Sequence, residues 1–218
     1  MPAAPTVIDD VFALDAGRGR GTGAPAGGGD DGPRGSGSAG SARRYFTGIS
    51  LGLAGILMFF MALTSAYIVR KGFGGDWQAL RLPPILFLNT VVLLASSLTM
   101  EIARRHAGGA QLDSFRRWWW VTTILGVAFL AGQVIAWRQL AAAGIYLPTN
   151  PASSFFYTLT AAHGAHLAGG ILALFYVAFR AWERAKITRA AAAEIASIYW
   201  HFMDGLWIFL LLLLYLGR

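Results

Sequence analysis

The chain has 218 residues, of which 56% are hydrophobic and only 13% are charged, and it contains no cysteine. Soluble domains usually have about 25% charged residues, so this composition predicts an integral membrane protein. The absence of cysteine excludes disulfides, thiolate metal sites, iron–sulfur clusters and covalently attached c-type haem. The net charge of +7 does not indicate nucleic-acid binding, because the basic residues lie in short loops beside helix ends, where they set membrane topology.

The first segment, residues 1–42, is rich in glycine, proline and alanine and contains no apolar run long enough to insert into a membrane. This composition is typical of a disordered segment. Without an apolar h-region it does not match a signal peptide. We therefore expect a disordered cytoplasmic tail, followed by one membrane domain over residues 43–218.

Five apolar runs follow this tail, and each is long enough to cross a bilayer as a helix. A span needs about 20 mostly apolar residues, and none of the runs alternates with period two as a barrel strand would. The predicted fold class is therefore all-α, an integral membrane bundle of five transmembrane helices. The expected spans are roughly 45–69, 83–103, 117–137, 153–180 and 197–216.

The basic residues near the span ends predict the orientation, because cytoplasmic loops of membrane proteins carry an excess of lysine and arginine. With the N-terminus inside, the inner side holds Arg34, Arg43, Arg44, Arg104, Arg105, Arg116, Arg117, Arg180, Arg184, Lys186 and Arg189. The outer side holds Arg70, Lys71, Arg81, Arg138 and Arg218. We expect a cytoplasmic N-terminus and a periplasmic C-terminus, in the inner membrane of a bacterium.

The fifth span carries a stripe of polar side chains. Glu194 and His201 are seven residues apart and share one helix face, and Asp204 lies next to them, three residues after His201. In a helix that begins near Ser197, Asp204 is about 10 Å inside. An unpaired aspartate within a span costs about 2.5–3.5 kcal/mol. Asp204 should therefore face protein and not lipid.

The fourth span carries His163 and His166, one turn apart. The fourth span begins outside and the fifth begins inside. The histidine pair is therefore expected nearer the outer leaflet and the His201/Asp204 pair nearer the inner leaflet, which leaves direct contact between the pairs open.

Three interpretations of these polar residues compete. Two histidines at positions i and i+3 can share a metal ion, but a closed site needs further ligands. A haem held by two histidines would need one on each of two helices at matching depth. We favour the third interpretation, in which the side chains join the helices to one another, to lipid headgroups or to a neighbouring subunit.

A group of basic and aromatic residues predicts a site for anionic phospholipid at the inner face. Aromatic rings anchor at the membrane interface, and a basic residue near an anionic surface contributes roughly 1 kcal/mol of attraction. The alternative is that these residues only set topology. The group consists of Arg116, Arg117, Trp118, Trp119, Trp120, Arg184, Lys186 and Arg189.

Two stretches of the chain carry a distinctive pattern of polar and aromatic residues. The first contains Phe155-Phe156, Thr158, Thr160, His163-Gly164 and His166, and the second contains Glu194, Tyr199-Trp200-His201-Phe202, Asp204, Trp207, Phe209 and Tyr215. Shorter stretches of the same kind lie at Leu82-Pro83-Pro84, Asn89-Thr90, Leu94-Ala95-Ser96-Ser97, Leu125-Gly126, Phe129 and Gln133. Over residues 45–218 the chain resembles subunit III of the haem–copper terminal oxidases, that is, the cytochrome c oxidase subunit III family, in its five-helix bacterial form.

The chain departs from this resemblance at two places. Many family members carry a carboxylate inside the first of these helices, where this chain has the apolar Gly55-Ile56-Leu57, and another after the glutamine of the third span, where Ala136 precedes Trp137. Any role of those carboxylates does not extend to this chain.

The resemblance implies an accessory subunit of a bacterial proton-pumping oxidase, which reduces oxygen to water with electrons from cytochrome c or quinol. Haems and copper would lie in subunits I and II, and this chain would hold none. It would pack against subunit I, bind phospholipid and preserve proton uptake, without being catalytic by itself. Two alternatives are a subunit III-like component of a nitric oxide reductase, and a small membrane transporter or metalloenzyme that uses the histidine pairs.

Overall fold

The computed structural model describes residues 36–217, except for 74, 76, 79, 81, 110 and 181–185. For 36–45, 180 and 186–188 it describes the helical backbone only. Residues 1–35 lie outside this range, so the tail predicted over 1–42 stays a prediction. The described part of the chain contains five α-helices and no strand. They are α2 (Ser36–Phe73), α3 (Ile85–Ala107), α4 (Leu112–Ala142), α5 (Pro151–Arg180) and α6 (Lys186–Leu216).

All five helices are long and apolar enough to cross a membrane, which confirms the predicted fold class. The candidate spans are Phe46–Phe73, Ile85–Ala107, Leu112–Ala142, Pro151–Phe179 and Arg189–Leu216. Several helices extend beyond the predicted spans, and α6 begins eleven residues before Ser197. This extension contains the run Ala190–Ala193, and alanine has the highest helix propensity of all residues. Hydropathy therefore locates the spans but not the helix ends.

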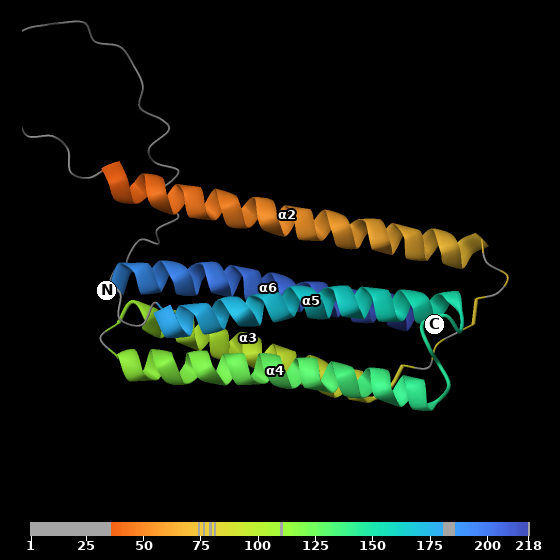
Figure 1. Cartoon of the computed structure of the whole chain (residues 1–218). Coiled ribbons are helices and arrows are strands. Elements are labelled where there is room, and N and C mark those ends of the chain that lie inside the picture. The colour runs from red at the N-terminus through yellow and green to blue at the C-terminus, as the bar shows by residue number, and fades with distance from the viewer. Residues whose placement is uncertain are drawn as a thin grey trace, which may run out of the picture. The chain divides into compact units, whose positions relative to one another are not determined.

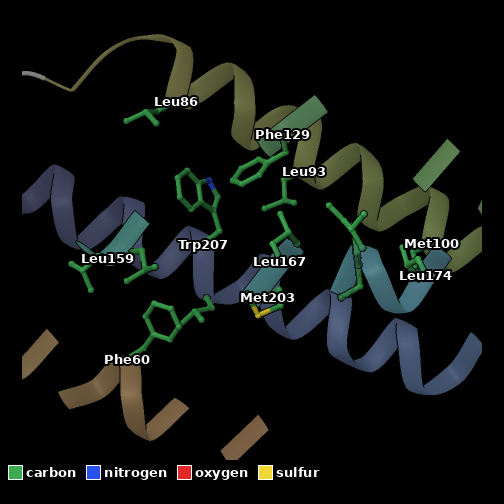
Figure 2. Packing of buried hydrophobic residues seen from close by; sticks show 14 of the residues in the cluster. Phe60, Leu86, Leu93, Met100, Phe129, Leu159, Leu167, Leu174, Met203 and Trp207 are labelled. Carbon is green, nitrogen blue, oxygen red and sulfur yellow. The ribbon is translucent and has the colours of Figure 1, made fainter. Parts of the chain in front are cut away.

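Helices α3 to α6 pack around a shared core (Figure 1). Helix α3 contacts α4 and α6, and α5 also contacts α4 and α6, so each of the four helices has two neighbours. Figure 2 shows Trp207 of α6 beside Phe129 of α4 and Leu93 of α3, and all three side chains are buried. The ring centroids of Phe129 and Trp207 are 4.9 Å apart in an edge-on arrangement. Dispersion contacts of this kind hold a membrane bundle together, because lipid tails are as apolar as the core.

Aromatic side chains of helix α2 contact α5 and the loop that follows α2. Phe60 lies 5.6 Å from the ring of His166, and Tyr67 lies 5.5 Å from Phe155 of α5 and 5.1 Å from Trp77. Only 6% of the apolar window of α2 is buried within the chain, against 28–44% for the other four spans. Most of the α2 surface is therefore available to lipid or to another subunit.

Trp200 of α6 joins three helices at one point. Its indole Nε1 donates a hydrogen bond to Ser96 Oγ of α3 at 2.9 Å. On the other side the ring lies against Gly126 of α4, where an added Cβ would lie 2.8 Å from Trp200 Cη2. A residue with a side chain at position 126 would push Trp200 away from its hydrogen-bond partner, so this close packing requires glycine.

Adjacent glycines of α5 offer a matched test of the packing between α5 and α6. A Cβ at Gly170 would lie 2.7 Å from Tyr199 Cε1, whereas one at Gly169 would meet nothing within 4 Å. Tyr199 is held in place because its hydroxyl donates to the His166 carbonyl at 2.7 Å. We expect Gly170→Ala to lower the free energy of unfolding by about 1–3 kcal/mol. Gly169→Ala should be neutral or stabilising by up to about 1 kcal/mol.

Unfolding of the purified variants in mixed detergent micelles, followed by circular dichroism, measures both changes. Equal stabilities of the two variants would contradict the packing described for Gly170.

Candidate functional site

His163 and Asp204 both lie near the middle of their helices, so the predicted separation in depth is larger than the observed one. His163 follows Pro151 of α5 by twelve residues, and Asp204 precedes Leu216 of the antiparallel α6 by twelve. At 1.5 Å per residue, each is about 18 Å from that end of the bundle. The 5.1 Å contact between the rings of His163 and Trp207 places His163 level with Trp207, which is three residues, or about 4.5 Å along α6, from Asp204. The error arose because α6 begins at Lys186, which moves Asp204 from one end of the helix to its middle.

The imidazole of His163 is completely buried among aromatic rings. Its centroid is 5.1 Å from that of Trp207 and 5.9 Å from that of Phe129. Neither ring nitrogen has a hydrogen-bond partner among the described residues. Trp207 is itself fixed by a 3.0 Å hydrogen bond from its Nε1 to Thr90 Oγ1 of α3. His163 therefore helps to join α4, α5 and α6.

His166 contacts a different part of the bundle from His163. Its Nδ1 lies 2.8 Å from the Ala162 carbonyl oxygen, and because a carbonyl can only accept, Nδ1 must be the donor. The ring lies 6.0 Å from Phe59 and 5.6 Å from Phe60, both on α2. The two histidines of α5 thus serve separate helix contacts and do not converge on a shared ligand.

The predicted polar residues of α6, His201 and Asp204, lie next to α3. His201 Nδ1 lies 2.5 Å from Ser97 Oγ of α3. Ser97 is also close enough to interact with Asp204, although neither carboxylate oxygen has a hydrogen-bond partner among the described residues. Asp204 is 4% exposed and His201 lies on the surface. Ser97 of α3 thus lies beside both His201 and Asp204, a relation that was not predicted from the sequence.

Comparison with known proteins agrees with this geometry. Residues 46–217 match the family model described as cytochrome c oxidase subunit III. The chain belongs to the cytochrome c oxidase subunit III family. The predicted resemblance is therefore confirmed, and the chain is subunit III of a haem–copper oxidase, a multi-pass protein of the bacterial plasma membrane.

Relatives from different bacteria match most of this subunit III. The probable cytochrome c oxidase subunit 3 of Mycobacterium tuberculosis (strain ATCC 25618 / H37Rv) is 35% identical over 176 residues, which cover 76% of this chain and 84% of the relative. Cytochrome c oxidase subunit 3 of Bacillus sp. (strain PS3) is 31% identical over 178 residues, 80% and 86% of the two chains. That of Thermostichus vulcanus is 34% identical over 167 residues, 73% and 80%.

Charged residues of this subunit III meet near one end of α3 and α6. Glu101 Oε2 accepts a 2.8 Å hydrogen bond from Arg104 Nε, and its Oε1 accepts one of 2.9 Å from Arg105 Nε. Glu194 of α6 is close enough to attract Arg104. Glu194 is among the residues predicted from the sequence and Glu101 is not, although the i, i+3 and i, i+4 spacing of Glu101 to the two arginines is a recognisable signal.

The residues predicted to bind lipid do not all lie on the surface of subunit III. Trp119 is completely buried and its Nε1 donates to the Leu174 carbonyl at 3.1 Å, whereas Trp118 and Trp120 are half-buried. Three consecutive residues of a helix are spread over about 200°, so they cannot all face the membrane interface. Arg116 and Arg117 are exposed and Arg189 is buried. Arg184 and the side chain of Lys186 lie outside the described residues.

Hydroxyl and indole side chains to which the sequence had assigned no such role also join the helices of subunit III. Thr99 Oγ1 of α3 is 2.8 Å from Thr122 Oγ1 of α4, and Trp137 Nε1 of α4 donates to Thr160 Oγ1 of α5 at 3.1 Å. Small polar residues within apolar helices are the signal that could have identified them. Within the described part of the chain, no three His, Asp or Glu side chains lie close enough together to hold a metal ion.

Proposed function

We propose that this subunit III is a non-catalytic scaffold that packs against oxidase subunits I and II, with its N-terminus in the cytoplasm, and binds phospholipid. In this role it keeps the proton entry and the active site of the complex intact during turnover. The haems and copper belong to the partner subunits. Membership of the family supports association with other oxidase subunits, and the small buried fraction of α2 supports a large contact surface.

The observation that carries the proposal is the use that the chain makes of its own histidines. His163 packs between aromatic rings, His166 and His106 bond to carbonyl groups of their own helices, and His201 bonds to Ser97. A haem or copper centre needs histidines that converge from different elements. In this bundle the four imidazoles point to separate partners, and those of His163, His166 and His201 contact side chains of other helices.

The isolated chain is therefore expected to bind no haem, copper or zinc in stoichiometric amount. Visible absorption and metal analysis of the purified chain after chelator washing measure this directly. A Soret band, or about one metal ion per chain, would contradict the scaffold function and support a membrane metalloenzyme.

We further propose that anionic phospholipid binds at the start of α4. Arg116 and Arg117 are exposed there beside the half-buried rings of Trp118 and Trp120, and basic groups next to aromatic anchors suit a membrane interface. Trp120 is packed against Phe175 of α5 at 5.6 Å, so its ring is held in place.

We propose a second lipid site towards the opposite end of the bundle. An open cleft of about 780 Å³ separates the last turns of α2 from the start of α5. Arg70, Asn150 and Ser154 supply polar groups to its lining, and Phe73 and Phe155 supply apolar surface. Polar groups beside apolar surface at a helix end suit a headgroup and the upper part of an acyl chain.

Replacing both Arg116 and Arg117 with glutamine should remove one retained anionic lipid from the complex and shorten its active lifetime during sustained turnover. Each basic residue near the surface contributes roughly 1 kcal/mol of attraction to anionic lipid, and glutamine keeps a similar helix propensity. Native mass spectrometry counts the lipid. Arg138→Gln, at the other end of the same helix, is the control. If the number of retained lipids and the active lifetime of the complex are unchanged, Arg116 and Arg117 only set topology and the proposed lipid site is wrong.

A further inference from the structure

A polar group on the outer surface of α3 and α6 lies near the middle of the membrane. His201 follows Arg189 by twelve residues and precedes Leu216 by fifteen, so it is close to the centre of its span. Its side chain is exposed and that of Ser97 is half-buried. At this depth the lipid headgroups are about 15 Å away, since the hydrocarbon core is about 30 Å thick. Lipid tails offer no hydrogen-bond partner, so a protein must cover this group.

The surroundings of His201 have the shape that a close helix contact needs. Gly205, one turn further along α6, is exposed, and an added Cβ there would meet nothing within 4 Å. Small residues let two helix backbones approach in a membrane. Apolar side chains border this notch on both helices, namely Leu94, Leu98, Ile198 and Ile208, which are 38–69% exposed. The face thus has a polar centre at His201, a shallow depression at Gly205 and a border of apolar side chains.

The hydrogen bonds within the chain determine which atom a neighbour can reach. Ser97 Oγ is hydrogen-bonded to His201 Nδ1 and also lies near the buried Asp204. His201 Nε2 is the remaining polar atom of the ring and lies on the exposed residue. The direction of the hydrogen bond at Nε2 depends on the positions of the protons on Ser97 and Asp204. A hydroxyl or amide suits this atom because it can either donate or accept, whereas a charged group at this depth costs about 2.5–3.5 kcal/mol.

Resting on the proposed function, we propose that the α3/α6 face centred on Ser97, His201 and Gly205 docks a transmembrane helix of the large haem-bearing subunit, and that this helix carries a hydroxyl or amide side chain at mid-membrane. The face continues towards Glu101, Arg104 and Glu194, whose charges can meet polar groups at the membrane edge. A twofold pair of this chain would place one His201 against the other, which makes a second copy the poorer occupant.

Because the chain contains no cysteine, a single cysteine can carry a photo-crosslinker without competing sites. Labels at Leu98 of α3 and at Ala128 of α4 form a matched pair, since both positions are exposed and α4 contributes no residue to the α3/α6 face. In the assembled complex, the label at Leu98 should crosslink to the large subunit and the label at Ala128 should not. Crosslinking of Leu98 to a second copy of this chain, or to lipid alone, would overturn the proposal.

Substitutions on the face give a second readout, namely the amount of large subunit that copurifies with a tagged chain. His201→Leu and Gly205→Leu should each reduce it by about fivefold or more, the effect of one lost net hydrogen bond or of a small clash. His201→Gln, whose amide can still bond, and Ala128→Leu should stay within about twofold of the wild type. Wild-type copurification of both leucine variants would overturn the docking face. If the unsubstituted chain itself copurifies with no haem-bearing subunit, the proposed function fails instead.

Discussion

Replacing Trp200 with alanine is expected to lower the free energy of unfolding of the chain by about 3–5 kcal/mol, the usual cost of removing a large buried aromatic side chain. The indole is 1% exposed, bonds to Ser96 of α3 and fills the space left by Gly126 of α4. Its removal leaves a cavity between three helices and takes away one hydrogen bond to Ser96 Oγ, which keeps only its bond to the Leu93 carbonyl. Lipid cannot replace these contacts, because the site lies inside the bundle.

An exposed aromatic residue provides the control for this experiment. Tyr176 of α5 is 63% exposed, and its replacement with alanine should change stability by no more than about 0.5 kcal/mol. Both variants are measured by unfolding in mixed micelles, with circular dichroism as the probe because one substitution removes a tryptophan fluorophore. A loss of less than about 1 kcal/mol for Trp200→Ala would show that Trp200 does not hold the three helices together.

Asp204→Leu is expected to reduce assembly with the large subunit while leaving membrane insertion intact or improved. Removal of the carboxylate abolishes an insertion cost of about 2.5–3.5 kcal/mol. The same substitution takes away the polar group beside Ser97 between α3 and α6. Ser97 positions the exposed His201, so the effect should reach the face that we propose for docking.

The measurements are the amount of chain in the membrane, the yield of the complex and its lifetime during turnover. Asp204→Asn is the matched variant, because it keeps the shape and the hydrogen-bonding capacity without the charge, and it should retain more of the complex than Asp204→Leu. If Asp204→Leu gives the wild-type yield and lifetime, Asp204 has no part in assembly.

Much of the fold could be predicted from hydropathy, because a membrane leaves few alternatives to apolar helices of about 20 residues. The number of spans is confirmed, whereas the helix ends are not determined by hydropathy. The segment that precedes Ser197 is helical through its alanines, and one wrong helix start displaced Asp204 from the middle of the bundle. The orientation and the tail over residues 1–42 remain predictions.

The candidate site could be predicted only in part, for a physical reason. Helical periodicity correctly places His201 and Asp204 together, because that relation is local. The contacts of His201 with Ser97, and of His163 with Trp207, join residues that are 104 and 44 positions apart. They depend on how two helices pack, which no local pattern contains. Trp119 shows the same limit, since its neighbours in sequence lie at the surface edge while its own ring enters the core.

The central claim is that this subunit III is a haem-free scaffold bound to a haem-bearing partner. The most direct test is to purify the oxidase through a tag on this chain in mild detergent, to dissociate it, and to record the absorption spectrum of each separated subunit. We predict that a large subunit copurifies with this chain, and that all haem absorption stays with the partner subunits after dissociation. Haem absorption that remains with this chain, or purification of the chain without any haem-bearing subunit, would contradict the claim.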